Sequence, residues 1–161
     1  MSKTIDKRVC AEVDGPFVLF LIGARLNRWW KPWVVFPFMA TMPKMLAELA
    51  AEPELGLMHA RSHFGVGGIM VVQYWRSFEA LEAYARDKQL AHQPAWSWFS
   101  KRLGSNGDIG IWHETYLIQP GAYENVYNNM PPHGLGAAGT LVDAVGARQE
   151  ARARVKASAG V

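Results

Sequence analysis

Residues 17–24 read Phe-Val-Leu-Phe-Leu-Ile-Gly-Ala, and this stretch decides the fold of the chain. Its aromatic and branched side chains, together with the Gly15-Pro16 pair before it, predict a strand that runs to Asn27. Successive side chains of a strand point to opposite faces. One face then carries Phe17, Leu19 and Leu21, and the other carries Val18, Phe20 and Ile22. Both faces are apolar, so both need a cover.

Further elements follow this strand in a regular order. Apolar residues at steps of three and four predict helices, and short β-rich runs predict strands. The order is strand, helix, strand, strand, helix, strand, which predicts an α+β, ferredoxin-like βαββαβ fold. The predicted strands cover residues 56–63, 69–75 and 109–118, and Gly65-Val66-Gly67-Gly68 forms a turn between the first two of these. The predicted helical segments cover residues 34–51, a stretch that begins at Ser77, whose hydroxyl can cap it, and residues 95–103.

The second apolar face of this sheet indicates how the chain is organised. Either the C-terminal segment or the sheet of a second subunit covers it, and the second choice is a dimeric α+β barrel, so we expect a homodimer. We predict an N-terminal arm over residues 1–15, a barrel domain over 16–121 and a C-terminal arm over 122–161. Within that arm, the Ala- and Arg-rich residues 140–156 favour a helix.

Charge and composition exclude several classes of protein. The net charge of +3 comes largely from the C-terminal tail, and no basic cluster indicates nucleic-acid binding. Residues 17–24 are too short an apolar run to span a bilayer, so we expect no integral membrane segment and a cytoplasmic protein. The apolar residues 29–45 favour a buried helix, with membrane-surface contact as the alternative. The single cysteine, Cys10, is read as an ordinary apolar residue.

The most polar cluster, His113-Glu114-Thr115-Tyr116, interrupts the last predicted strand. Alternation places His113 on one face and Glu114, with Trp112 and Tyr116, on the other. A half-buried, unpaired carboxylate has a raised pKa and can act as an acid or base. The structural alternative pairs Glu114 with Arg25 or with a tyrosine hydroxyl. We expect Glu114 to face a pocket between sheet and helices, beside Trp112 and Tyr116.

A second cluster is aromatic and surrounds the second predicted helix. Such residues form either core or a pocket for a flat apolar ligand. Arg25 could bind an anionic substrate or form a salt bridge. No metal site is expected, because His59 and His63 lie roughly 13 Å apart on one strand. The predicted substrate-binding residues are Tyr74, Trp75, Tyr84, Trp96, Trp112 and Arg25.

Four stretches resemble a known family. They are Tyr74-Trp75-Arg76-Ser77, Ala83-Tyr84-Ala85-Arg86-Asp87, Gly110-Ile111-Trp112-His113-Glu114-Thr115-Tyr116 and Asn128-Asn129-Met130-Pro131-Pro132. They resemble uncharacterised proteins named after a monooxygenase of fumagillin polyketide biosynthesis, within the antibiotic-biosynthesis monooxygenase (dimeric α+β barrel) superfamily. The resemblance covers about residues 15–137.

The resemblance implies a small monooxygenase that acts on an apolar, polyketide-like or aromatic compound. Many such proteins use no cofactor, because the substrate is deprotonated and its anion reacts with O₂. This chemistry needs a base and a donor for the developing oxyanion. We assign Glu114 or His113 as the base and Tyr116 or Trp96 as the donor.

Two alternatives stay open. Other relatives in this superfamily bind haem, among them haem-degrading monooxygenases and aldoxime dehydratases, and in the former the axial histidine follows the second helix. His92 lies near that place, offset by about two residues, so it is the cofactor-binding residue if haem is bound. The third reading is a non-catalytic dimer that binds a hydrophobic ligand.

Overall fold

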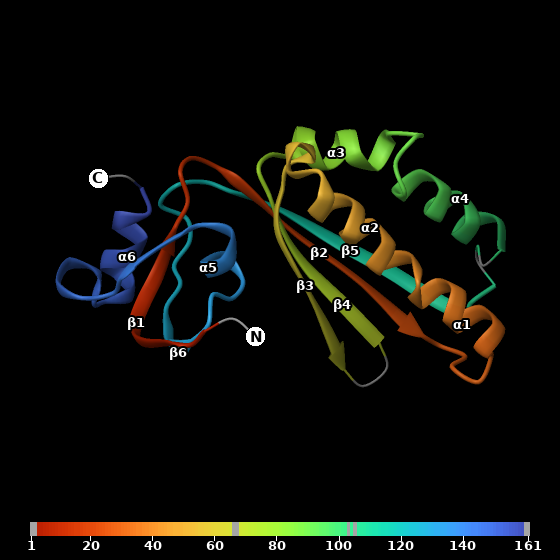
Figure 1. The fold of residues 1–161 in the computed structure, drawn as a ribbon, viewed down its shortest axis with the longest axis horizontal. Coiled ribbons are helices and arrows are strands. Elements are labelled where there is room, and N and C mark those ends of the chain that lie inside the picture. Colours follow the sequence, from red (N-terminus) through yellow and green to blue (C-terminus); the bar gives the residue numbers. More distant parts are fainter. Residues whose placement is uncertain (1–2, 66–67, 103, 105, 160–161) are drawn as a thin grey trace.

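Two antiparallel sheets form the framework of the computed structural model, which describes residues 3–65, 68–102, 104 and 106–159 (Figure 1). The larger sheet has the strand order β3-β4-β2-β5, and helices α1 to α4 lie on one of its faces. This confirms the predicted α+β, ferredoxin-like βαββαβ order. Its elements are β2 (Phe17–Leu26), α1 (Pro32–Met39), α2 (Thr41–Ala51), β3 (Leu57–Gly65), β4 (Gly68–Trp75), α3 (Phe78–Arg86), α4 (His92–Arg102) and β5 (Ile109–Ile118), with a 3₁₀ turn, η1 (Pro53–Leu55), before β3.

Strand β2 lies at the centre of this sheet, and its register fixes which side chains share a face. Leu21 pairs with Val72 of β4 and with Glu114 of β5. Val18 and Phe20, at alternate positions, pack with the helices in a core that contains Leu49, Trp75, Leu81 and Tyr84. The odd-numbered residues of β2 therefore point to the opposite side, which we call the outer face. Strand β5 forms an edge of the sheet.

The predicted helix over residues 34–51 is divided into α1 and α2 at Ala40. Pro43 has no N–H to donate to the carbonyl of Met39, which removes one helical hydrogen bond at this point. The predicted cap of α3 is confirmed, since the Ser77 hydroxyl accepts a hydrogen bond from the Ala80 N–H at 3.2 Å. The turn between β3 and β4 was predicted to include residues 66 and 67, which lie outside the described residues.

Helices α1 and α2 are unusually apolar and unusually exposed. Together, over Pro32–Ala51, they are long and apolar enough to cross a membrane by length and composition alone, which is weak evidence by itself. Only 11% of the most apolar 18-residue stretch of this segment is buried. On its inner side, however, α1 packs Val34 and Phe38 against Ala24 and Ile109 of the sheet. Helix α1 is therefore held to the sheet along one side.

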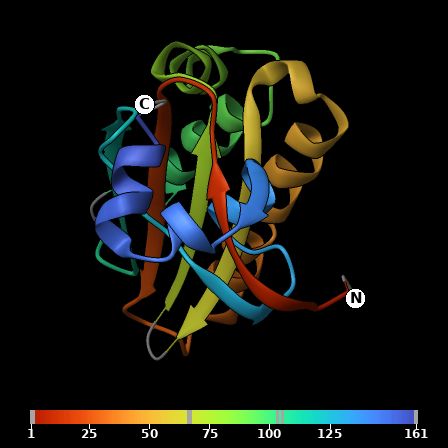
Figure 2. The same cartoon turned by 90° about the vertical axis from the view of Figure 1, so that its left-hand side faces the viewer.

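The second sheet, of order β6-β1-β7, corrects two predictions (Figure 2). Residues 1–15 were predicted as a polar arm, but Ile5–Glu12 form strand β1, whose residues Val9, Cys10 and Ala11 are buried. Residues 140–156 were predicted as one helix, but long-range pairing with β1, such as Cys10 with Val142, overrides helix propensity there. The domain boundaries at residues 15 and 121 stay predictions. The elements are β1, β6 (Tyr127–Met130), α5 (Leu135–Ala138), β7 (Thr140–Asp143), η2 (Gly146–Arg148) and α6 (Ala151–Ala157).

The C-terminal segment covers one end of the outer face of the main sheet. Leu135 of α5 is buried against Phe17, with Tyr74 packed beside them. Farther along β5, Trp112 and Tyr116 remain 41% and 45% exposed. The first of the two predicted covers, the C-terminal segment, is therefore present over part of the face. Among the described residues, nothing covers the rest of it.

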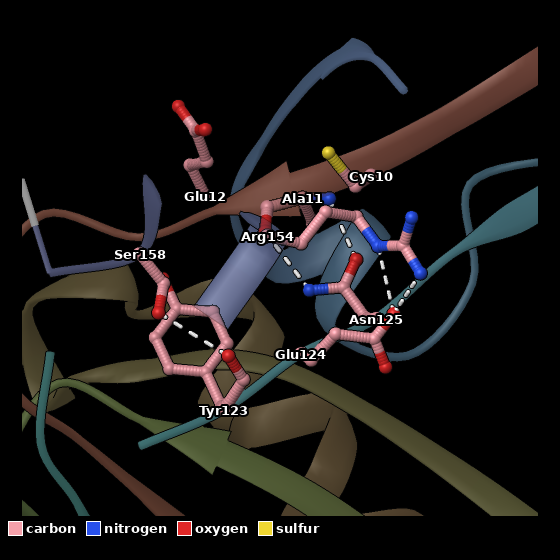
Figure 3. Close-up of a pocket in the computed structure, with 8 residues that line it drawn as sticks. All are labelled: Cys10, Ala11, Glu12, Tyr123, Glu124, Asn125, Arg154 and Ser158. Carbon is pink, nitrogen blue, oxygen red and sulfur yellow. Dashed lines mark hydrogen bonds and ion pairs between the residues drawn. The ribbon is translucent and has the colours of Figure 1, made fainter. Parts of the chain in front are cut away.

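A buried arginine attaches helix α6 to the body of the protein (Figure 3). Arg154 is 6% exposed, pairs with Glu124 through Nε at 2.7 Å, and donates to the carbonyls of Arg148 and Gln149. The cavity beside it, next to Cys10, holds about 10 Å³. Burial and the nearby Glu12 raise the pKa of the Cys10 thiol, so this cysteine is not activated.

The Arg154→Leu variant is expected to lose about 2 kcal/mol of unfolding free energy, because Glu124 and two carbonyls lose a charged donor. Urea denaturation measures the loss. The matched control is Arg152→Leu, at an exposed position of the same helix. Equal stability of the two variants would contradict the assigned role of Arg154.

The contact between α5 and β3 contains a histidine cluster. His59 Nε2 and His133 Nδ1 are buried without a hydrogen-bond partner among the described residues, and the rings of His63 and His133 lie 6.2 Å apart. Burial lowers the pKa of His59 and of His133 below the ordinary value of 6.5, and the nearby positive charge of Arg61 adds to this.

Acid is therefore expected to destabilise the fold through these two rings. Since their folded pKa values are depressed, their stabilising contribution is complete above the unfolded pKa and is lost as the pH falls through the folded values. Urea midpoints should fall between about pH 7 and pH 5, and less so in the double variant His59→Gln, His133→Gln. The control is His113→Gln, and an unchanged pH slope in the double variant would contradict the prediction.

Candidate functional site

An apolar pocket lies between the main sheet and helices α2, α3 and α4. The cavity has a volume of about 60 Å³ and opens to solvent. Two methionines on α2 form part of its wall, and such flexible side chains can move to admit a ligand. The lining residues are Phe20, Ile22, Met42, Met45, Leu46, Leu49, Gln73, Trp75, Leu81, Tyr84, Ala85 and His92.

His92, the first residue of α4, contributes an imidazole ring to this wall. Its Nδ1 lies 2.8 Å from the carbonyl oxygen of Ala85, which also accepts a hydrogen bond from Gln93. A carbonyl can only accept, so Nδ1 carries the proton and Nε2 of the neutral ring holds a lone pair. The neutral ring is thus held in one tautomer, and the described residues give its Nε2 no hydrogen-bond partner.

Glu48 of α2 holds the start of α4 in place. Its carboxylate accepts hydrogen bonds from the Tyr84 hydroxyl at 2.9 Å and from the Ala91 N–H at 3.0 Å. Burial and then the bond to Glu48 raise the pKa of Tyr84, so this phenol stays protonated at neutral pH. Glu48 therefore links α2, α3 and the residue before His92.

The sheet side of the pocket contains a buried polar pair. Gln73 is 5% exposed, and its Oε1 accepts a hydrogen bond from the Trp75 indole N–H at 2.8 Å. The structure gives the other amide atom, Nε2, no acceptor among the described residues. This leaves an N–H donor on a strand that lines the pocket. The centroid of the Tyr84 ring lies 5.8 Å from that of Trp75 and 6.1 Å from that of His92.

The predicted position of Glu114 in this pocket is wrong. Glu114 pairs with Leu21 and lies with Trp112 and Tyr116 on the outer face, away from the helices. All three are exposed. The predicted alternative, a tyrosine partner, is present: the Tyr116 hydroxyl donates to Glu114 at 2.7 Å, and this bond raises the pKa of Tyr116. The Trp112 indole instead covers Gly23, where a Cβ would lie 2.5 Å from it.

The other predicted residues are distributed over several places. His113 lies on the helix side, 5.7 Å from the Phe20 ring, but on the exposed edge strand and outside the pocket wall. Tyr74 packs on the outer face, 6.3 Å from Phe17. Trp96 is 50% exposed and stacks on Phe99. Arg25 is exposed at the far end of β2.

Of the predicted site residues, the pocket therefore brings together Trp75, Tyr84 and His92. The sequence reading missed Gln73 and Glu48 as polar parts of this region. A signal existed for each, since Gln73 interrupts an apolar strand and Glu48 interrupts an apolar helix face. The described residues contain no group of three or more His, Cys, Asp or Glu side chains that could hold a metal ion.

Haem does not fit the pocket in this conformation. His92 could offer Nε2 as an axial ligand, but the cavity of about 60 Å³ leaves no room for a porphyrin beside it. Accommodating one would require α2 and α4 to separate, which would break the bonds that Glu48 makes to Tyr84 and Ala91.

The fold and pocket define a ferredoxin-like α+β protein with an apolar site beneath its helices. Residues 17–135 match the family described as Monooxygenase af470-like, and the chain therefore belongs to that family, as the sequence resemblance predicted. Monooxygenase af470 of Aspergillus fumigatus is 29% identical over 133 residues, which are 76% of this chain and 46% of that protein. The chain spans less than half the length of this relative.

Solved structures of similar shape include two named enzymes. SnoaB, a cofactor-independent oxygenase from Streptomyces nogalater, is 12% identical with a TM-score of 0.46, covering 62% of this chain and 90% of its own. The aldoxime dehydratase OxdRE, in complex with butyraldoxime, is 12% identical with a TM-score of 0.49, covering 83% of this chain and 41% of its own. Both scores are low, and neither structure bears on the function of this chain.

Proposed function

We propose that this chain is a monooxygenase-like enzyme that binds an apolar, acidic small molecule in the pocket beneath α2, α3 and α4. The observation that carries this proposal is His92, whose Nδ1 is held by the Ala85 carbonyl, while the described residues give Nε2 no hydrogen-bond partner. The membership in a family named for a monooxygenase supports oxygen chemistry. The base in this proposal is His92, in place of Glu114 or His113.

The proposed reaction needs no group beyond substrate, O₂ and the chain. His92 Nε2 takes one proton from an activated CH₂ group of the substrate, which leaves an electron-rich carbanion. The carbanion is oxidised as O₂ is reduced to the peroxide level: a C–O bond forms, and the proton held by His92 completes the C–OOH group. Loss of the second C–H proton and cleavage of the O–O bond give a ketone and one water. The Gln73 amide N–H would stabilise the oxygen anion of the deprotonated substrate.

The same proposal includes a homodimer in the cytoplasm. The open part of the outer face carries Leu19, Leu21, Trp112 and Tyr116, and a second copy of the sheet would cover these apolar groups. Light scattering is expected to give the mass of two chains. A strict monomer would contradict the proposed covering of this face.

Oxygen uptake with ¹⁸O₂ tests the reaction. Purified protein is supplied with an acidic phenol that bears an activated CH₂ group, and the product is analysed by mass spectrometry. One ¹⁸O atom is expected in the new ketone and the other in water. A product without ¹⁸O would contradict oxygenation, and ligand binding without any O₂ uptake would support the non-catalytic alternative.

A further inference from the structure

An aromatic patch lies on the loop before α1 and on the outer side of α1. It consists of Trp29, Trp30, Trp33 and Phe36, which are 72%, 57%, 71% and 73% exposed. Large aromatic side chains are normally placed against other apolar groups, and a cluster of this kind on a surface indicates a contact site. The patch is at the end of the helical layer farthest from β1, β6 and β7 (Figure 1).

Helix α1 is apolar on both of its sides. Val34 and Phe38 pack on the sheet, while Trp33 and Phe36 point away from it. A helix that is apolar all round is usually buried, yet none of the residues of α1 is buried. Within the described part of the chain, nothing covers the outer side.

The charge around the patch is positive. Residues 15–47 contain no Asp or Glu and include Arg25, Arg28, Lys31 and Lys44. Arg28 and Lys31 both pair with the buried Asp108, so together they exceed its charge by one. Lys44 is exposed on the first turn of α2, which follows α1 directly.

We propose that the aromatic patch docks into the interfacial region of an anionic lipid bilayer, with α1 lying in the plane of the membrane surface. Tryptophan rings favour this region, and a helix with one apolar side and flanking lysines lies along it. Spanning the bilayer is incompatible with the fold, because Val34 and Phe38 are already packed on the sheet.

The positive charge around the patch favours an anionic bilayer over a second copy of the chain as its partner. Two copies joined through the patch would bring two positively charged surfaces together, which opposes association. Anionic lipid headgroups complement the same surface. The proposal does not rest on the catalytic role of the pocket, although α2 follows α1 directly and lines that pocket. Docking would place the pocket close to the lipid phase in which apolar compounds accumulate.

Co-sedimentation with vesicles tests the proposal. The wild-type chain is expected to bind vesicles of phosphatidylcholine mixed with phosphatidylserine, and to bind phosphatidylcholine vesicles more weakly. The double variant Trp33→Ser, Phe36→Ser should bind about tenfold less tightly or worse, because two interfacial anchors are lost. The matched control is Phe78→Ser, Val145→Ser, which removes exposed apolar groups elsewhere and should bind like the wild type.

A charge-reversal pair tests the electrostatic part. Lys44→Glu is expected to weaken binding to the phosphatidylserine vesicles by roughly fivefold or more, whereas Lys88→Glu, with the same change in net charge, should have little effect. Far-UV circular dichroism confirms that each variant is folded. The proposal is overturned if the wild type does not bind these vesicles, or if the patch variants and their control variants lose binding equally. It is also overturned if the patch causes self-association without lipid.

Discussion

The His92→Ala variant is expected to lose turnover by roughly 10²–10⁴-fold, which is the usual contribution of a positioned general base. The loss should appear in kcat, while the affinity for the apolar substrate changes little. The other eleven residues that line the pocket are apolar or keep their own hydrogen-bond partners. Initial rates of O₂ uptake and direct ligand titration measure the two effects separately. Gln93 still donates to the Ala85 carbonyl in this variant, so the turn before α4 keeps one of its bonds.

The control for this prediction is His113→Ala. His113 lies on the same side of the sheet but outside the pocket wall, and it was one of the bases predicted from the sequence. We expect its rate to stay close to that of the wild type. If His113→Ala lost turnover and His92→Ala kept it, the base would be His113 on the edge strand β5 and not His92.

Replacement of Trp75 by alanine is expected to cost about 3–5 kcal/mol of unfolding free energy. Trp75 is 1% exposed and packs in the main core with Val18, Leu49 and Leu81. The variant leaves a cavity and also removes the indole donor of the buried Gln73. Urea denaturation with circular dichroism measures the change.

Trp96→Ala serves as the control, because this side chain is 50% exposed and stacks on Phe99 at the surface of α4. Its expected loss is about 1 kcal/mol or less. Equal losses for the two tryptophans would show that Trp75 does not have the structural role assigned to it.

The main sheet could be predicted because its strands carry strong local signals. The run around Leu19 and the cap at Ser77 are both readable without tertiary information, and the order of elements then limits the fold. Strand β1 could not be predicted in this way, because its polar ends resemble a solvated arm. It exists because residues from the far end of the chain, such as Leu141 and Val142, pair with it.

The candidate site was harder to predict for a different physical reason. Alternation divides β5 into two sets of side chains, one with His113 and one with Glu114, but it does not say which set faces the helices. That choice depends on the register between β5 and β2, where His113 pairs with Ile22. His92 was counted in the aromatic cluster around the second helix and was given a role only as a haem ligand. Its tautomer depends on the Ala85 carbonyl, a backbone contact that the sequence does not reveal.

The central claim is that the ligand binds beneath the helices and not on the outer face. Trp75 and Trp112 lie on opposite faces of the same sheet, so their indole N–H signals in ¹⁵N NMR report on the two locations. They can be assigned with the variants Trp75→Phe and Trp112→Phe. Titration with an acidic phenol is expected to shift the Trp75 signal and leave Trp112 nearly unchanged. A shift of Trp112 with no change at Trp75 would contradict the account and return the site to Glu114 and Tyr116.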